Sequence, residues 1–270
     1  MMRADATHPF TIRRYERLAS TNDTARALVA EGVPHGTVVW ALSQSAGRGR
    51  QGRSWVSPPG NLYASVILRL RAPVPRLSDL GFLAALGVAD ALDGVPGLRG
   101  RAQLKWPNDV LLEGRKVAGI LPEAMIAADA SHAVILGIGI NLREAPTGTP
   151  YPATCLAANG AADVTPERML DALLLPALAR WLARWEAEGF EPARRAWMDR
   201  AYGLGGNGRL RSGDGWLEGR LIALDQDGAL LVETAAGPRR ITAGEVAFGP
   251  AQAGGADGVA SPDAPAAACP

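Results

Sequence analysis

The sequence predicts an α+β protein: a central mixed or antiparallel sheet with helices, followed by a small SH3-like β-barrel. Its 270 residues have a hydrophobic content of 47%, enough to fill one good-sized core and a smaller second one. Beyond closely spaced glycines at 203–208 the apolar period changes to two, with turns between short strands. We therefore expect a large domain over 1–203, a small domain over 204–249, and a disordered Ala/Gly/Pro-rich tail over 250–270.

The first half of the chain supplies three expected strands and two expected helices. The strands are β-branched and apolar runs, and the first helix follows Ser, Thr, Asn and Asp, the residue types preferred at helix caps. The second helix has apolar residues at helical spacing and few charges, which is typical of a buried helix. The strands are Phe10–Leu18, Thr37–Leu42 and Leu62–Leu70, and the helices are Ala25–Ala30 and Leu77–Leu92.

The second half begins with a strand pair that a proline interrupts. Pro107 cannot sit in a central ladder, so it predicts a break within Leu104–Leu112. The later helices are amphipathic, and the first of them opens with a proline in its first turn, where proline is tolerated. The remaining expected strands are Lys116–Leu121, Ala133–Leu142, Arg209–Arg211, Trp216–Leu224, Ala229–Thr234 and Arg239–Thr242, and the helices are Thr165–Gly189 and Glu191–Tyr202.

Composition and charge exclude several classes of function. A formal net charge of +1 gives no basic field for nucleic acid, so specific DNA binding is not expected. The N-terminus has no apolar signal region, and the apolar runs are too short to span a bilayer, which predicts a cytoplasmic protein. The three histidines and two cysteines show no metal-ligand spacing, so zinc chemistry is not expected.

The stretch Gln44–Trp55 alternates glycines with arginines and predicts a mobile anion cradle. Its glycines free the backbone, and its guanidinium forks can surround a phosphate-bearing ligand, with Trp55 as an apolar wall or lid. Taken alone, the stretch is equally compatible with a solvated surface loop or an RNA-binding Arg/Gly tract. The glycines are Gly47, Gly49 and Gly52, and the arginines are Arg48, Arg50 and Arg53.

Lys105 and Lys116 are the only lysines among 28 Lys and Arg residues. A point-like ammonium and a planar guanidinium are not interchangeable at a tight site, so a chain that otherwise uses Arg has a reason to keep Lys there. The alternative is that both lysines lie by chance on a surface hairpin. Between them, Asn108 and Asp109 offer oxygen ligands for Mg²⁺ and its phosphates, although an ordinary Asx turn would use the same residues.

Two further patterns indicate a binding slot. Gly137 and Gly139 point to the same side of an expected strand, and their missing side chains leave room for a flat ligand or another backbone. The residues Ser20–Asn22 at the first helix start either cap that helix or also hold a small polar ligand.

Together these blocks resemble the biotin protein ligases, also called biotin–[acetyl-CoA-carboxylase] ligases. The blocks occur in family order and extend over nearly the whole chain. They are Ser20–Asn22, Gln44–Trp55, Gly60–Tyr63, Lys105–Asp109, Arg115–Leu121 with Glu123, Gly137–Asn141, Gly228–Val232 and Gly244–Glu245.

The resemblance implies the class II aminoacyl-tRNA-synthetase-like catalytic fold of biotin and lipoate ligases, and a two-step reaction with biotin, ATP and Mg²⁺. Biotin is adenylated to biotinyl-5′-AMP and passed to a lysine of a biotin carboxyl carrier protein, and catalysis is implied for Lys116, Arg48 and Arg50. Implied biotin contacts are Ser20, Thr21, Asn22, Gln44, Arg48, Gly49, Arg50, Lys116, Gly119, Gly137 and Gly139. Implied ATP and adenylate contacts are Arg48, Arg50, Arg53, Trp55, Asn108, Asp109, Lys116 and Asn141, with Asp109 as metal ligand.

One departure from the family pattern concerns the N-terminus. Bifunctional members carry a winged helix-turn-helix ahead of the Ser-Thr-Asn block, and only nineteen residues precede Ser20, so we expect a monofunctional ligase, with a homodimer as an open possibility. A lipoate ligase shares the fold and the adenylation chemistry, but the Arg/Gly loop and the C-terminal barrel favour biotin. A non-catalytic biotin or nucleotide sensor has no need of the two lysines and Asn108–Asp109.

Overall fold

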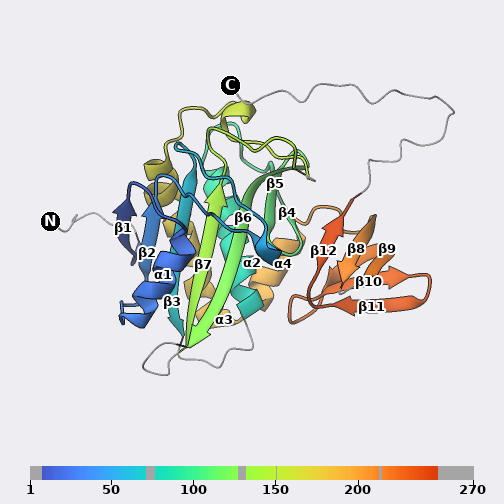
Figure 1. The fold of residues 1–270 in the computed structure, drawn as a ribbon. Helices are drawn as coiled ribbons and strands as arrows, with labels where there is room; N and C mark the ends of the chain where they lie inside the picture. The colour runs from blue at the N-terminus through green and yellow to red at the C-terminus, as the bar shows by residue number, and fades with distance from the viewer. Residues whose placement is uncertain (1–7, 71–76, 127–131, 150, 213–214, 249–270) are drawn as a thin grey trace.

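The computed structural model describes residues 8–70, 77–126, 132–149, 151–212 and 215–248. Its body is a seven-stranded sheet in the order β1-β2-β3-β7-β6-β5-β4 (Figure 1). Only β1 and β2 are parallel neighbours in this sheet, so it is mixed, and the predicted α+β class is confirmed. The strands are β1 Thr11–Tyr15, β2 Thr37–Ala41, β3 Leu62–Leu70, β4 Ala102–Lys105, β5 Asp109–Leu112, β6 Arg115–Ile126 and β7 His132–Ile140.

Helices cover both faces of this sheet. Along β2 the side chains alternate between two apolar clusters: Val38 and Trp40 belong to the large core, and Val39 belongs to a small one with residues of α1. Helix α1 (Thr21–Ala30) therefore packs on one face, and α2 (Leu77–Asp93), α3 (Leu175–Glu188) and α4 (Glu191–Met198) lie on the other.

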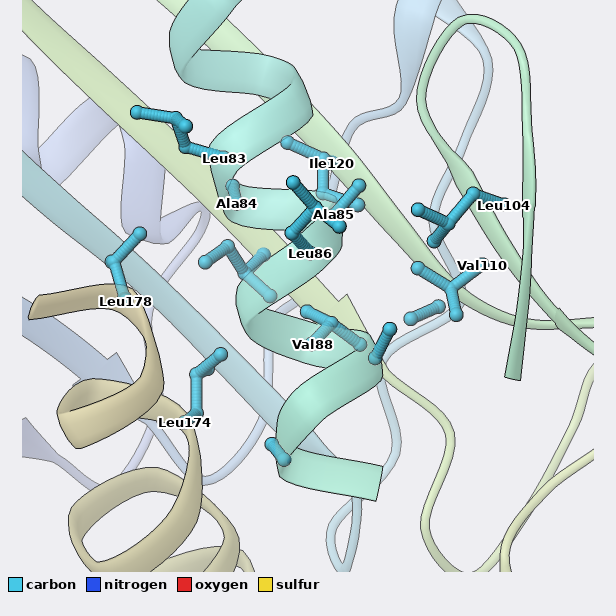
Figure 2. Packing of buried hydrophobic residues seen from close by; sticks show 14 of the residues in the cluster. Leu83, Ala84, Ala85, Leu86, Val88, Leu104, Val110, Ile120, Leu174 and Leu178 are labelled. Carbon is cyan, nitrogen blue, oxygen red and sulfur yellow. The ribbon is translucent and has the colours of Figure 1, made fainter. Parts of the chain in front are cut away.

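Helix α2 is the centre of the large core. Figure 2 shows Ile120, Val110 and Leu104 of the strands on one side of it, and Leu174 and Leu178 of the neighbouring helical segment on the other. A helix between two apolar layers must be apolar all round, which explains the few charges in its sequence.

The expected helix over Thr165–Gly189 is continuous, but its first part is a wider π-type turn over Arg168–Leu174. Pro176 lies just beyond this turn and has no backbone N–H to donate one helical turn back, while its ring crowds the carbonyl there. Widening the helix relieves both problems, and periodicity alone does not predict it.

Strand β6 continues to Ile126, beyond the predicted end at Leu121, because it pairs with β7 over its whole length. Pro122 is tolerated there because β5 pairs with β6 only as far as Gly119, which leaves the other edge of β6 without a ladder at the proline. The predicted break at Pro107 is confirmed, since a turn separates β4 from β5.

The C-terminal part is a five-stranded antiparallel sheet in the order β11-β10-β9-β8-β12. Sequence periodicity misses β12 because it is only three residues long and depends on pairing with β8. The predicted boundary between 203 and 204 stays a prediction, and the tail 250–270 lies outside the described residues. The strands are β8 Asn207–Ser212, β9 Gly215–Leu224, β10 Leu230–Thr234, β11 Gly237–Ile241 and β12 Glu245–Ala247.

The two sheets are joined through Gly228, in the turn before β10. Its carbonyl accepts a hydrogen bond of 3.1 Å from the indole of Trp106, and a Cβ at this glycine would lie 2.4 Å from the Phe82 ring of α2. The small sheet is thus packed against the large core. In the described part of the chain, no helix is long and apolar enough to cross a membrane.

Candidate active site

A pocket lies where the start of α1, the middle of the large sheet and the loop 44–55 meet, and we call it the glycine pocket. The helix start supplies buried polar groups, the sheet supplies glycines, and the loop supplies an arginine and a tryptophan. The residues lining it include Ser20, Thr21, Asn22, Gln44, Arg48, Gly49, Trp55, Tyr63, Asn108, Lys116, Gly119, Gly137 and Gly139.

Strand register brings the glycines of the pocket together. Gly119 of β6 pairs with Gly139 of β7, which pairs in turn with Tyr63 of β3. Two residues earlier in β7, on the same face of the sheet, Gly137 pairs with Ser65 of β3. Side chains at the glycine positions would fill the space in front of the sheet, so the slot predicted from Gly137 and Gly139 lies on the α1 face.

The indole of Trp55 lies in this slot. A Cβ at Gly139 would come within 2.6 Å of the indole, and one at Gly119 within 3.0 Å. The indole N–H is buried without a hydrogen-bond partner in the described structure. Trp55 therefore lines the glycine pocket with the residues predicted for biotin and with Arg48, Asn108 and Lys116, which are also predicted for ATP or the adenylate. Only about 50 Å³ of the pocket is left free.

The Arg/Gly loop folds back on itself as a small hairpin. The Trp55 N–H donates to the Gly47 carbonyl at 2.9 Å, and the Gly49 N–H donates to the Arg53 carbonyl at 2.7 Å. A Cβ at Gly47 would lie 2.5 Å from the Trp55 carbonyl oxygen, so only glycine fits at the base of the hairpin.

The three loop arginines have different partners. Arg48 pairs with Asp23 of α1. Arg50 donates to the Asn108 side-chain oxygen at 3.2 Å and to the Gly244 carbonyl at 3.1 Å. Arg53 makes a two-pronged ion pair with Glu245 of β12. The loop is thus held between the two sheets by its own cations.

A second pocket, which we call the lysine pocket, lies beside the first and shares Lys116 and Asn108 with it. The Nζ of Lys116 lies 2.6 Å from Oδ1 of Asp109. The residues lining this pocket are Arg50, Gln51, Arg53, Lys105, Trp106, Pro107, Asn108, Asp109, Lys116, Gly244 and Glu245.

The lysine pocket is rich in cations with few counter-ions. Burial lowers the pKa of Arg50, while the hydrogen bond from Arg53 lowers the pKa of Glu245 and keeps that carboxylate ionised. Two lysines and two arginines face two carboxylates among the lining residues, an arrangement suited to a polyanion such as a triphosphate.

The residues of this pocket fit Mg²⁺ that arrives with phosphates, but not a closed protein cage. No group of three or more His, Cys, Asp or Glu side chains is placed to hold a metal in the parts of the chain that the structure describes. Mg²⁺ usually takes one or two carboxylates and completes its shell with water and substrate oxygens. Asp109 and Glu245 supply such carboxylates.

The structure brings most of the predicted site residues into these two pockets. The residues predicted for biotin line the glycine pocket, except that Arg50 lines the lysine pocket. Asn141, predicted on the adenylate side, lines neither pocket. It is 2% exposed, its amide donates to the Thr154 carbonyl at 3.1 Å, and its side-chain oxygen has no partner in the described structure.

Comparisons with known proteins agree with this geometry. Residues 15–141 match the Biotin/lipoate A/B protein ligase family, and residues 208–249 match the Biotin protein ligase C terminal domain. A Biotin--[acetyl-CoA-carboxylase] ligase of Paracoccus denitrificans is 43% identical over 86% of this chain and 98% of its own length. The chain belongs to the biotin protein ligase family.

Solved structures of biotin protein ligases show the same fold. The Aquifex aeolicus enzyme in complex with biotin and ATP has a TM-score of 0.74 and 30% identity, over 88% of this chain and 97% of its own. The Leishmania major enzyme in complex with biotinyl-5-AMP has a TM-score of 0.61 and 27% identity, over 87% of this chain and 100% of its own.

In this biotin protein ligase, several residues shape the site although the sequence assigned them no site role; two of them belong to the blocks Gly60–Tyr63 and Gly244–Glu245. Tyr63 lines the glycine pocket, and Glu245 of β12 lines the lysine pocket and holds Arg53. Tyr151 contacts both parts of the protein: its hydroxyl donates to the Val246 carbonyl and accepts from the Phe248 N–H. The rarity of lysine singled out Lys105, but no site role was assigned to it.

Lys105 is a buried ammonium in the wall of the lysine pocket. It is 2% exposed, and its Nζ lies 3.2 Å from the centre of the Tyr151 ring, a cation–π contact. Burial lowers the pKa of Lys105 to about 8, although Asp109 and Glu245 oppose the shift. A phosphate bound beside such a lysine would stabilise its charged ammonium form.

The low pKa of Lys105 predicts a pH-dependent stability that Lys105→Met removes. Between pH about 8 and 10.5 the unfolded chain keeps the proton that the folded chain has lost, so the free energy of unfolding of the wild type rises with pH in this window. We expect the stability advantage of Lys105→Met over the wild type to shrink by about 3 kcal/mol across the window. Urea unfolding of both proteins from pH 7 to 10.5 measures it, and a constant difference would contradict the prediction.

Proposed function

We propose that this protein is an ATP-dependent ligase that activates biotin as biotinyl-5′-AMP and transfers it to a lysine of a biotin carboxyl carrier protein, such as that of acetyl-CoA carboxylase. The observation that carries the proposal is the shared wall of the two pockets. A glycine-walled slot for a flat ring system and a cationic pocket for phosphates meet at Lys116, where the two substrates must react. The named relatives and the family membership support it.

In the first step, an oxygen of the biotin carboxylate attacks the α-phosphorus of ATP and pyrophosphate leaves. Lys116 lines both pockets. In the proposed reaction its ammonium contacts the carboxylate and the α-phosphate and offsets the charge of both. Asp109 would hold Mg²⁺ that arrives with ATP, and the ion would neutralise charge on the phosphates. Arg50 and Arg53 face the nucleotide, and rigid positioning of two anions supplies much of the rate.

In the second step, the neutral amine of the carrier lysine attacks the acyl carbon, AMP leaves and an amide forms. The Arg/Gly loop covers the acyl-adenylate until then, with Arg48 on the biotin side and Arg50 and Arg53 on the nucleotide side. Excluding water prevents hydrolysis of the reactive mixed anhydride.

Two rival functions are tested by the same assays. A lipoate ligase would release pyrophosphate with lipoate in place of biotin, and the match of 208–249 to the biotin protein ligase C-terminal domain favours biotin. A biotin or nucleotide sensor would release no pyrophosphate at all. The proposal further includes a cytoplasmic location. The homodimer stays a prediction, which a light-scattering measurement of the molar mass in solution would test.

The decisive experiment is incubation with biotin, Mg·ATP and a purified biotin carboxyl carrier domain, followed by intact mass spectrometry. We expect the carrier to gain one biotinyl group and ATP to yield AMP and pyrophosphate. An unmodified carrier with undiminished ATP would overturn the proposal. Omitting either biotin or ATP provides the negative controls.

Ligand should protect the Arg/Gly loop from trypsin. Arg48 and Arg53 are exposed in the absence of ligand, and the glycines beside them allow the loop to open. We expect cleavage after Arg48, Arg50 or Arg53 in the free protein, and at least tenfold slower cleavage with biotin and ATP present. Exposed Arg99 is the internal control, since its cleavage should not change. Equal cleavage of the loop with and without ligand would contradict loop closure.

A further inference from the structure

A chain of hydrogen bonds runs from a carboxylate on β6, through the polar wall of the glycine pocket, toward the helix start. Glu123 accepts from the side-chain amide of Asn22 at 2.9 Å. The Asn22 oxygen lies 2.6 Å from the hydroxyl of Ser65, which lies 2.8 Å from the hydroxyl of Thr21. Ser65 and Glu123 do not line the pocket, and Ser65 is 0% exposed.

The carboxylate fixes the direction of every proton in this chain. An ionised carboxylate only accepts, so the Asn22 amide must turn its NH₂ group to Glu123 and its oxygen to Ser65. That oxygen also only accepts, so the single proton of the Ser65 hydroxyl is directed at Asn22. The contact between Ser65 and Thr21 then requires the Thr21 hydroxyl to be the donor.

The Thr21 hydroxyl is free to donate to Ser65, because Gln44 takes its shorter hydrogen bond from the backbone N–H of Thr21. The side-chain oxygen of Gln44 accepts from the Thr21 N–H at 2.8 Å, a shorter contact than the 3.2 Å between that oxygen and the Thr21 hydroxyl. Gln44 is held in turn by Ser57, whose hydroxyl accepts from the Gln44 amide at 2.9 Å. With its proton directed at Ser65, the Thr21 hydroxyl presents only lone pairs to the pocket.

We propose that Glu123 and Ser65 are positioning residues that fix the Thr21 hydroxyl as a hydrogen-bond acceptor, so that the pocket selects a ligand ring bearing an N–H donor. The inference rests on the proposed function and deepens it. The ureido ring of biotin carries two N–H groups, whereas the dithiolane ring of lipoate carries none. A buried acceptor left without its donor is costly, so this arrangement discriminates against lipoate.

The test uses two biotin analogues in which one or the other ureido N–H is replaced by an ether-type oxygen. We expect the wild type to use one of them at least a hundredfold less efficiently than biotin, measured as kcat/KM for pyrophosphate release. In Ser65→Ala the Thr21 hydroxyl can turn and donate to the oxygen of the analogue. The ratio of kcat/KM for biotin to kcat/KM for that analogue should therefore fall to about tenfold or less. The KM for biotin should rise about tenfold, while the KM for ATP stays within about twofold.

Glu123→Ala is the second variant, because it removes the acceptor that lies 2.9 Å from the Asn22 amide and leaves only the Leu121 carbonyl, at 3.4 Å, to fix the orientation of that amide. This variant should also lower the ratio of kcat/KM for biotin to kcat/KM for the analogue, and it tests the inference even if Ser65→Ala does not fold. Ser43→Ala is the matched control, since that hydroxyl is exposed and lies 3.4 Å from the Glu16 carbonyl. It should leave the ratio unchanged.

The outcomes separate this inference from the function on which it rests. A wild type that releases pyrophosphate with biotin, combined with biotin-to-analogue kcat/KM ratios in Ser65→Ala and Glu123→Ala equal to the wild-type ratio, would overturn the positioning role alone. A wild type that releases none with biotin would overturn the proposed function and this inference together.

Discussion

Replacing Lys116 by Arg should slow formation of biotinyl-5′-AMP almost as much as replacing it by Gln. In this protein Lys116 lines both pockets, and its ammonium lies 2.6 Å from Asp109. When the biotin carboxylate approaches the α-phosphate, two anions meet and charge grows on phosphorus. A compact ammonium can contact oxygens of both, whereas a planar guanidinium with its rigid fork of donors does not replace a point charge at such a site.

The expected size of the effect follows from the loss of one preorganised electrostatic contact. Such a loss costs about 2.7 to 4 kcal/mol in the transition state, on the order of a hundredfold to a thousandfold in rate. Because the contact acts mainly in the transition state, the KM for biotin should change by less than about tenfold. Single-turnover formation of the adenylate at saturating biotin and ATP measures the rate.

Arg115→Gln is the matched control for Lys116. It removes the neighbouring cation of the same strand, whose guanidinium is directed toward Glu113 at 4.0 Å and not into either pocket. Its rate should stay within about twofold of the wild type. A Lys116→Arg enzyme with the wild-type rate would remove Lys116 from the catalytic residues.

The sequence predicts those parts of the site that follow from residue type and spacing within one segment. Gly137 and Gly139 alternate along one strand, so their shared face follows from strand geometry alone. Lys105 and Lys116 are conspicuous because the chain otherwise uses Arg. The break at Pro107 follows from the missing N–H of proline.

Contacts between segments far apart in the chain are not predictable in this way. Glu245 forms an ion pair with Arg53, which is 192 residues away in the sequence, and the sequence around neither residue predicts the pairing. The position of Trp55 against Gly139 depends on the fold of the loop, and no local pattern in the sequence predicts that contact. Ser65 is a small polar residue in a mostly apolar strand, which is a usable signal, but its role depends on the pairing of β3 with β7 at Gly137.

Filling the glycine slot should greatly weaken the binding of biotin without unfolding the protein. Gly139 lies in the middle of β7, and its backbone is not in the left-handed region, so a β-branched residue is compatible with the strand. Its Cβ would lie 2.6 Å from the Trp55 indole, on the face where the ring system of biotin is expected. Gly139→Val therefore displaces both the indole and the ligand.

The expected loss for Gly139→Val is on the order of a hundredfold in biotin affinity, because overpacking alone costs about 1 to 3 kcal/mol and the added methyl groups also occupy ligand volume. Isothermal titration with biotin measures it. ATP binding should change less than about threefold, because Gly139 does not line the lysine pocket. Gly215→Ala is the matched strand control, since a Cβ there meets nothing within 4 Å. Tight biotin binding by Gly139→Val would show that the ring system of biotin binds elsewhere, whereas loss of both ligands together with a lowered Tm would indicate general unfolding.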